Sequence, residues 1–242
     1  MSLSSSSKFP VALLSQAKTG DVLATSAEVW PDLLVDAYEH GIFPWPSGEE
    51  DLIPWCSPKK RALLFFNEMK LPKSLSKAKR KAEEDPSLVI TRDTEFGAVI
   101  RACANKPRPG QPGTWITSAM IEAYEGLHQM GRAHSVEVWR VVDTGKNDGP
   151  SADGLETRLI AGIYGVDCGG AFSAESMFYE EPNASKIALL FLIERLKEKG
   201  CEWLDIQQLT PHLEKLGARE IKRSEYLQLL SQAQASQGGK IF

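Results

Sequence analysis

The chain has 242 residues, of which 42% are hydrophobic and 25% charged, and a formal net charge of −4. This composition is typical of a globular protein, and it excludes a strongly basic nucleic-acid-binding protein, so a polyanionic partner would need a local basic patch. No apolar run approaches the length of a membrane span, and the start, MSLSSSSK, lacks the apolar segment of a signal peptide. We therefore expect a cytoplasmic protein with no membrane partner. The four cysteines are all at least 33 residues apart, which predicts no disulfide framework and no metal site.

The first third of the chain contains two distinctive segments. After a helix expected from Pro31 to Gly41, IFPWPSGEEDLIPWCSP holds four prolines and two tryptophans, which predicts an irregular segment. It could plug a small core or form an aromatic platform for a base. Residues 70–81 then carry six Lys or Arg side chains and no acidic one. In a helix, Lys73, Lys77 and Arg80 share one face, which is either a solvated face or a phosphate-binding patch.

The rest of the chain reads as alternating strands and helices. In order, we expect a strand at 88–91, helices at 94–104 and 117–131, a strand at 135–142, strands at 159–166 and 171–178, a helix from about 183 to 200, a strand at 202–207, a short helix ending near 217, a strand at 220–223 and a terminal helix from 224. Gly169-Gly170 suits a hairpin turn, and Asn183 or Ser185 can cap the helix that follows. The sum is an α+β fold whose sheet is mainly antiparallel.

Three polar residues stand out in the central part of the chain. Asp205 and Gln207 fall on one face of the strand expected at 202–207, while Leu204 and Ile206 fall on the other. Glu175 lies in the otherwise apolar stretch AFSAESMF, so it needs a partner and is either a structural hydrogen-bonding group or part of a site. The sequence contains no Ser-His-Asp order, GxSxG elbow, Walker loop or GxGxxG motif, and the isolated His134 and His212 read as structural.

Nine motifs, in this order, carry a resemblance to a known family: AYEHGIFPW, WCSPKKRALL, TWI, AHSVEVW, GIYGV, FSAESMF, NASKIALL, LDIQ and HLEKLGA. Together they closely resemble the leucyl/phenylalanyl-tRNA–protein transferases. The resemblance implies a small N-terminal α/β domain, residues 1–66, and a larger catalytic domain, residues 67–242, similar to GNAT acetyltransferases. It also implies transfer of Leu or Phe, and less readily Met, from aminoacyl-tRNA to the N-terminal Arg or Lys of a protein, which marks that protein for degradation by the N-end rule.

The resemblance also implies roles for particular residues. Asp205 and Gln207 would orient the acceptor amine and help its proton leave, with Glu175 supporting Gln207. Because a neutral Gln is no Brønsted base, Asp205 is the member of that pair able to accept a proton. The implied aminoacyl pocket comprises Ile163, Phe172, Met177, Leu189, Leu192 and Leu204. Tyr38, Trp45 and Trp115 would lie near the aminoacyl-adenosine, and Lys73, Lys77 and Arg80 would face the tRNA acceptor stem.

The implied enzyme needs no cofactor, because the tRNA ester is already activated, and we expect it to act as a monomer. The sequence departs from the family pattern at Ala174 and Tyr179. We also hypothesise that Glu180 and Glu181 attract the basic N-terminal residue of the acceptor protein. Two alternatives remain at this stage. A CoA-dependent acetyltransferase would share the fold, but the Q/R-x-x-G-x-G/A pyrophosphate loop is not visible. A tRNA-binding protein without catalysis would not need Glu175, Asp205 and Gln207.

Overall fold

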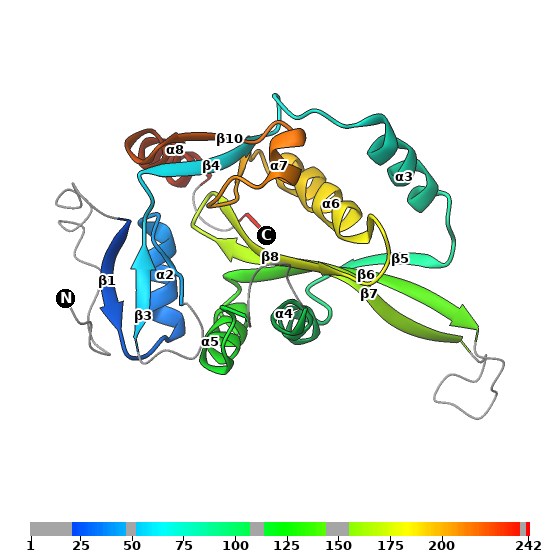
Figure 1. Ribbon diagram of the computed structural model, residues 1–242, viewed down its shortest axis with the longest axis horizontal. Coiled ribbons are helices and arrows are strands. Elements are labelled where there is room, and N and C mark those ends of the chain that lie inside the picture. The colour runs from blue at the N-terminus through cyan, green and yellow to red at the C-terminus, as the bar shows by residue number, and fades with distance from the viewer. Residues whose placement is uncertain (1–20, 47–51, 107–113, 144–154, 238–240) are drawn as a thin grey trace.

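A small unit of one helix and three short strands lies at the N-terminal end of the described chain. The computed structural model describes residues 21–46, 52–106, 114–143, 155–237 and 241–242. The unit contains β1 (Val22–Ser26), α2 (Pro31–Glu39), β2 (Phe43–Pro44) and β3 (Ile53–Cys56), with the antiparallel strand order β1-β3-β2 (Figure 1). The prediction of an irregular segment here was wrong for its described part. β2 and β3 pair, and the Pro54 carbonyl accepts a hydrogen bond from the Trp45 N–H at 2.8 Å.

A seven-stranded sheet forms the rest of the framework, with the order β10-β4-β9-β8-β7-β6-β5. Its strands are β4 (Lys60–Phe65), β5 (Leu88–Arg92), β6 (Ala133–Asp143), β7 (Leu155–Asp167), β8 (Phe172–Tyr179), β9 (Trp203–Asp205) and β10 (Arg219–Lys222). Neighbouring strands are antiparallel except β8 and β9, so the expected antiparallel-leaning α+β sheet is confirmed. β4 belongs to this sheet although it precedes residue 66, where we drew the domain boundary; the domain division stays a prediction.

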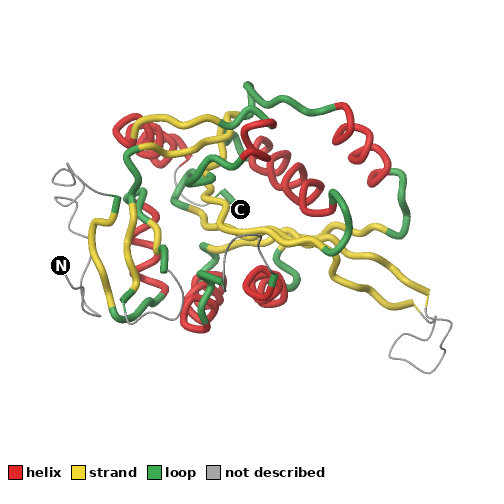
Figure 2. The backbone as a smooth tube through the Cα atoms, in the orientation of Figure 1, coloured by secondary structure: helices red, strands yellow, loops and turns green. Residues whose placement is uncertain are grey.

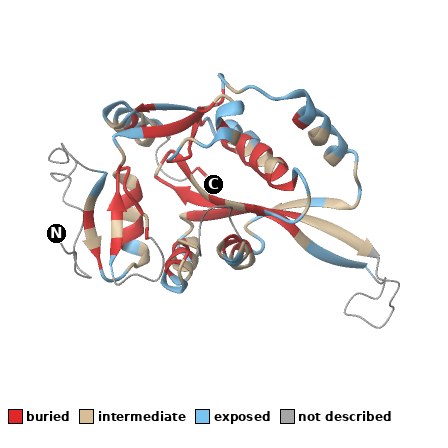
Figure 3. Cartoon of the chain, in the orientation of Figure 1, coloured by how far each residue is buried: buried red, intermediate tan, exposed pale blue. Residues whose placement is uncertain are grey.

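Helices cover both faces of the large sheet (Figures 1 and 2). They are α3 (Lys73–Glu83), α4 (Phe96–Asn105), α5 (Ser118–Gln129), α6 (Ala184–Glu198), α7 (Pro211–Lys215) and α8 (Arg223–Gln237). α6 packs on β6, β7 and β8 and carries α3 against its outer side, whereas α4 and α5 lie on the opposite face. Each face has its own apolar core, and the sheet strands between them are largely buried (Figure 3).

Local sequence signals account for most element ends. Thr117 caps α5 by accepting a hydrogen bond from the Met120 N–H at 3.3 Å, and Gly169 and Gly170 adopt φ values of 84° and 138° in the hairpin between β7 and β8. The predicted side-chain cap of α6 was wrong, because Asn183 occupies the capping position without a capping hydrogen bond. The strand expected to reach Gln207 ends at Asp205, since Gln207 has a φ of 53° and leaves the extended conformation.

The parallel pairing of β8 and β9 brings distant residues together. Parallel neighbours need a crossover connection, and α6 supplies it between the end of β8 and the start of β9. Ser173 on β8 is thereby paired with Asp205 on β9, and Asp205 is also opposite Leu63 on β4. The crossover therefore places the predicted polar residues of β8 beside those that follow β9.

Candidate active site

A cavity of about 390 Å³ lies between the N-terminal unit and the α6 face of the large sheet. It is lined by Phe43, Pro44, Trp45, Trp115, Ile163, Ala174, Glu175, Ser176, Met177, Leu189, Ile206, Gln207, Gln208, Thr210 and Leu213. Ile163, Met177 and Leu189 of the predicted aminoacyl pocket are among them. Phe172, Leu192 and Leu204 are not; the structure places them in the buried core of the same sheet face.

An irregularity in β8 explains why the cavity wall carries so many β8 side chains. Tyr164 pairs with Ser176 and Gly165 pairs with Ala174, so Glu175 is an extra residue in a β-bulge. A regular strand presents only alternate residues to one side, whereas residues 174–177 line the cavity consecutively. The bulge therefore turns the Glu175 carboxylate toward the cavity.

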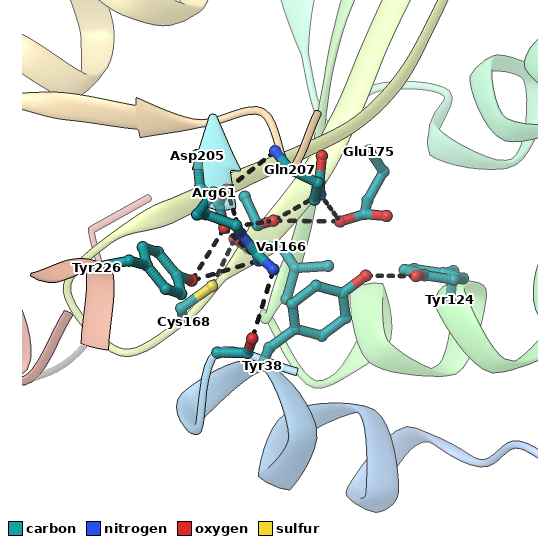
Figure 4. A network of polar contacts seen from close by, with 11 residues as sticks. Tyr38, Arg61, Tyr124, Val166, Cys168, Glu175, Asp205, Gln207 and Tyr226 are labelled. Carbon is teal, nitrogen blue, oxygen red and sulfur yellow. Dashed lines mark hydrogen bonds and ion pairs between the residues drawn. The ribbon is translucent and has the colours of Figure 1, made fainter. Parts of the chain in front are cut away.

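Gln207 lies in the turn that follows β9, at the same wall. Its Nε2 donates hydrogen bonds to Ser173 Oγ at 2.8 Å and to Glu175 Oε1 at 2.7 Å (Figure 4). A carboxamide nitrogen has two hydrogens, so both are used, and Oε1 is directed away from these two partners. The side chain therefore has a fixed orientation and an oxygen suited to accept a hydrogen bond from a ligand.

Asp205 is fully buried and does not line the cavity. Its Oδ1 accepts hydrogen bonds from Arg61 Nε at 2.8 Å and from the Gln207 N–H at 3.0 Å. Its Oδ2 accepts from Arg61 Nη2 at 2.6 Å and from the Tyr226 hydroxyl at 2.9 Å, and Ser173 Oγ is 3.3 Å away (Figure 4). Because a carboxylate has about four lone-pair positions, these donors use its accepting capacity.

Glu175 has a different environment. Burial raises the pKa of its carboxyl from 4.5 to about 7, and the charge of Asp205 acts in the same direction. A hydrogen bond from Tyr38, the charge of Arg61 and a hydrogen bond from Ser173 oppose the rise. The Tyr38 and Tyr124 side chains are buried, and their hydroxyls are hydrogen-bonded to each other at 2.5 Å (Figure 4). Glu175 is thus the carboxylate at the cavity wall, and it titrates near neutral pH.

The three aromatic residues predicted to lie near an aminoacyl-adenosine are placed differently. Trp45 and Trp115 line the cavity and are partly exposed, so their rings are open to a ligand. Tyr38 is buried on α2 and does not line the cavity. The structure adds Phe43, whose ring centroid is 5.6 Å from that of Trp45.

The charged residues predicted to meet substrates lie on the outer surface. Lys73, Lys77 and Arg80 are exposed on α3. Glu181, by contrast, is engaged in ion pairs with Arg140 at 2.7 Å and Arg158 at 3.3 Å, while Glu180 pairs with Lys106 at 2.9 Å. Neither residue lines the cavity, and both carboxylates are already paired with basic side chains of the protein. The structure therefore gives no support to their predicted role in attracting the basic N-terminal residue of the acceptor.

Arg61 and Tyr226, which hold Asp205, were not predicted from the sequence. A usable signal was present for Arg61, because it stands in the apolar strand KRALLF and a buried arginine requires an anionic partner. Within the described residues, no group of three or more His, Cys, Asp or Glu side chains could hold a metal ion. No helix there is long and apolar enough to cross a membrane.

Comparison with known proteins decides the family. A family model described as leucyl/phenylalanyl-tRNA protein transferase matches residues 63–231, and one for the N-terminal domain of the same family matches residues 28–59. The chain belongs to the leucyl/phenylalanyl-tRNA protein transferase family. A family member from Burkholderia multivorans is 43% identical over 206 residues, covering 85% of this chain and 75% of its own length. Another, from Syntrophotalea carbinolica, is 42% identical over 220 residues, covering 91% of this chain and 87% of its own.

Similarity to solved structures is weaker. The crystal structure of FemX aligns with 89% of this chain and 76% of its own chain, with a TM-score of 0.47 and 11% sequence identity. The match to the leucyl/phenylalanyl-tRNA protein transferase family therefore rests on sequence. It includes both parts of the cavity wall, because the matched ranges contain Phe43 and Trp45 as well as Glu175 and Gln207.

Proposed function

We propose that this protein transfers leucine or phenylalanine, and less readily methionine, from aminoacyl-tRNA to the N-terminal Arg or Lys of proteins. The product would carry a degradation signal of the N-end rule. Membership of the transferase family supports the reaction class. The observation that carries the proposal is an apolar cavity with a fixed carboxamide, Gln207, and an adjacent carboxylate, Glu175, at one wall.

The chemistry is aminolysis of an ester. The acceptor α-amine attacks the aminoacyl carbonyl carbon, a C–N bond forms, the bond from that carbon to the ribose 3′ oxygen breaks, and one proton passes from nitrogen to the departing oxygen. An α-amine has a pKa of about 7.7 to 8.0, so part of it is already nucleophilic at neutral pH. Holding amine and ester together can remove about 7 to 11 kcal/mol of the barrier.

Two side chains would act on the acceptor amine, one by orienting it and the other by accepting its proton. Gln207 Oε1 accepts a hydrogen bond from the amine and aims its lone pair, since both Nε2 hydrogens are committed to Ser173 and Glu175. Glu175 takes the proton, because it is the carboxylate at the cavity wall whereas Asp205 is enclosed by its donors. The sequence left the route of the proton open and indicated only that Asp205, unlike Gln207, is able to accept one.

In this proposal the cavity would hold an apolar amino acid joined to adenosine. Ile163, Met177 and Leu189 provide its apolar lining, and an apolar pocket separates side chains by only about 1 to 3 kcal/mol per methylene, which suits a site that admits both Leu and Phe. Trp45 and Trp115 offer rings on which an adenine can stack, each contributing about 1 to 3 kcal/mol.

The exposed face of α3 is proposed to bind tRNA phosphates. Lys79 pairs with Glu194 of α6 at 3.1 Å, which ties α3 to α6. Lys73, Lys77 and Arg80 remain exposed, with Arg80 4.0 Å from Glu84 of the same helix region. The acceptor stem of a tRNA is an A-form helix that presents phosphates and a shallow minor groove, and a basic helix face can recognise that shape.

Charge reversal tests this face. We expect K77E/R80E to weaken binding of aminoacyl-tRNA and to reduce the slope of log Kd against log salt, because fewer counterions are released on binding. The measurement is a salt titration of tRNA binding. K59E/K60E, at two exposed lysines where β4 begins, makes the same change in net charge and should leave the slope near the wild-type value. An unchanged slope in K77E/R80E would reject the assignment.

Further features remain proposals. We propose a small N-terminal domain and a larger catalytic domain of GNAT-like fold, as predicted with the division at residues 1–66 and 67–242. The family match to residues 28–59 supports a separate N-terminal domain, and the pairing of β4 with β9 favours moving its end to a point before β4. We propose that the protein acts as a monomer in the cytoplasm, where charged tRNA is available, and uses no cofactor because the ester is already activated.

The function is tested by following a label. Purified protein is mixed with labelled leucyl-tRNA or labelled acetyl-CoA and a peptide that begins with Arg. Transfer of leucine to the peptide is the expected result, and a peptide that begins with Ala serves as the control acceptor. Transfer from acetyl-CoA would instead indicate an acetyltransferase. Binding of tRNA without transfer of either label would indicate a binding protein without catalysis.

A further inference from the structure

Arg61 on β4 is a buried cation with an unusually complete set of partners. Arg61 is only 1% exposed to solvent. Its guanidinium forms a bidentate ion pair with Asp205 through Nε at 2.8 Å and Nη2 at 2.6 Å. The guanidinium carbon lies 4.6 Å from the centroid of the Phe43 ring and 4.5 Å from that of the Tyr226 ring. The planar cation therefore lies within cation–π distance of two aromatic rings while its edge holds a carboxylate; Figure 4 shows Arg61 with Tyr226 and Asp205.

One end of this arrangement reaches the Gln207 turn. Asp205 Oδ1, fixed by Arg61, accepts a hydrogen bond from the Gln207 N–H at 3.0 Å, within a turn where Gln207 has a φ of 53°. A non-glycine residue in this region is held only by its surroundings. Asp205 thus fixes the backbone from which the Gln207 side chain extends into the cavity wall.

The other end reaches the aromatic side of the cavity. Phe43, on β2 of the N-terminal unit, lines the cavity and contacts Trp45, and Arg61 Nη1 also approaches the Gly41 carbonyl at 3.4 Å. Arg61 itself belongs to the large sheet. One side chain therefore connects the wall that would hold the adenosine with the turn that would aim the amine.

We propose that Arg61 is a positioning residue of the transfer reaction, which through Asp205 and Phe43 sets the distance between the Gln207 carboxamide and the aromatic wall. In this assignment, which rests on the proposed function, Asp205 acts as an anchor with its charge neutralised by Arg61. Asp205 would have to break that ion pair to accept a proton, and removing one partner of a buried pair is strongly unfavourable.

Lysine cannot take over this role. It keeps the positive charge, but its ammonium is a point charge that makes no bidentate pair with Asp205 and offers no planar group to the Phe43 and Tyr226 rings. R61K therefore separates charge from geometry. We expect kcat for transfer of leucine to an Arg-peptide to fall about 100-fold, as a displacement of about 1 Å can cause, with a smaller change in KM for leucyl-tRNA.

The experiment compares wild type, R61K and the double variant R61M/D205N. The double variant removes both charges of the pair together, and the carboxamide introduced at position 205 can still accept a hydrogen bond from the Gln207 N–H and donate one to the Tyr226 hydroxyl oxygen, so no buried charge is left unpaired. It therefore controls for loss of folding in R61K, and we expect it to unfold in urea near the wild-type midpoint while its kcat stays reduced. Wild-type kcat in R61K, or recovery of kcat together with stability in the double variant, would overturn the proposal.

A second readout keeps this result separate from the proposed function. If wild type transfers no leucine, the proposed function fails, and Arg61 is then judged on binding of a 3′-amide analogue of phenylalanyl-adenosine, followed by tryptophan fluorescence. A positioning role predicts at least tenfold weaker binding in R61K, because the cavity walls no longer keep their spacing. Equal affinity in the two proteins would contradict it.

Discussion

Replacing Glu175 by glutamine lowers kcat for aminoacyl transfer by about 10²- to 10⁴-fold, the usual contribution of a positioned proton acceptor. Glutamine has nearly the same shape, and its Oε1 can still accept the hydrogen bond that Gln207 Nε2 makes to Glu175 at 2.7 Å. The change therefore removes the proton-accepting group and leaves the orientation of Gln207 in place. Steady-state kinetics with an Arg-peptide provide the measurement.

The pH profile gives the same test an independent readout. Burial raises the pKa of Glu175 to about 7, and the group accepts a proton only when ionised, so wild-type kcat should fall as the pH drops below about 7. In E175Q, kcat should no longer fall with this pKa. In both proteins kcat/KM should still fall as the pH drops below about 7.7 to 8.0, because the free acceptor amine becomes protonated there. An acidic limb that persists near pH 7 in E175Q would show that another group takes the proton.

Stability should change in the opposite sense to activity. A carboxyl whose folded-state pKa is raised stabilises the protein while it is protonated, below its usual value of 4.5, and this stabilisation is lost as the pH rises through about 7. Above that pH, E175Q should exceed wild type in unfolding free energy by up to about 3 kcal/mol. E137Q is the matched control, because Glu137 is a buried carboxylate held by Ser135 and Thr91 outside the cavity lining.

Periodicity predicted the elements of the fold because it depends on local packing. The two-residue alternation before and after Gly169-Gly170 predicted the β7–β8 hairpin, and the apolar run from Ile187 to Ile193 predicted a helix buried on a sheet. Periodicity alone does not tell which of the apolar residues on a buried face line the cavity. Leu189 lines it and Leu192 lies in the core, although both are buried leucines on α6.

The parts of the candidate site that sequence reasoning missed depend on contacts between distant segments. Asp205 is enclosed because β4 and β8 lie on its two sides, which brings Arg61 and Ser173 to the same carboxylate. A single sequence gives no sign of that strand order. Glu175 was singled out because a carboxylate in an apolar strand needs a partner, although this pattern alone left a structural role open and the family resemblance supplied its role in the site. The argument from burial applies equally to Arg61.

Replacing Gly165 by alanine should damage both stability and catalysis. Gly165 is opposite the bulge that contains Glu175, and an added Cβ would collide with the backbone oxygen of Ser173 and lie 3.1 Å from the Cα of Ala174. The backbone of β8 would have to move away from β7 to make room. Overpacking of this kind costs about 1 to 3 kcal/mol, and displacement of the bulge should lower kcat about 100-fold.

Gly162, on the same strand, supplies the control that separates these two effects. A Cβ there would meet the side chain of Val99, at 2.8 Å from Cγ2, and that of Phe178, but no atom of the β8 backbone is among its nearest neighbours. G162A should therefore lose stability by overpacking in urea unfolding while retaining kcat within a few-fold of wild type. If G162A and G165A lost equal stability and equal kcat, the bulge would have no particular role in placing Glu175, and the catalytic loss would follow from general loosening of the sheet. A loss of kcat confined to G165A would show that the backbone geometry of the bulge sets the position of the carboxylate.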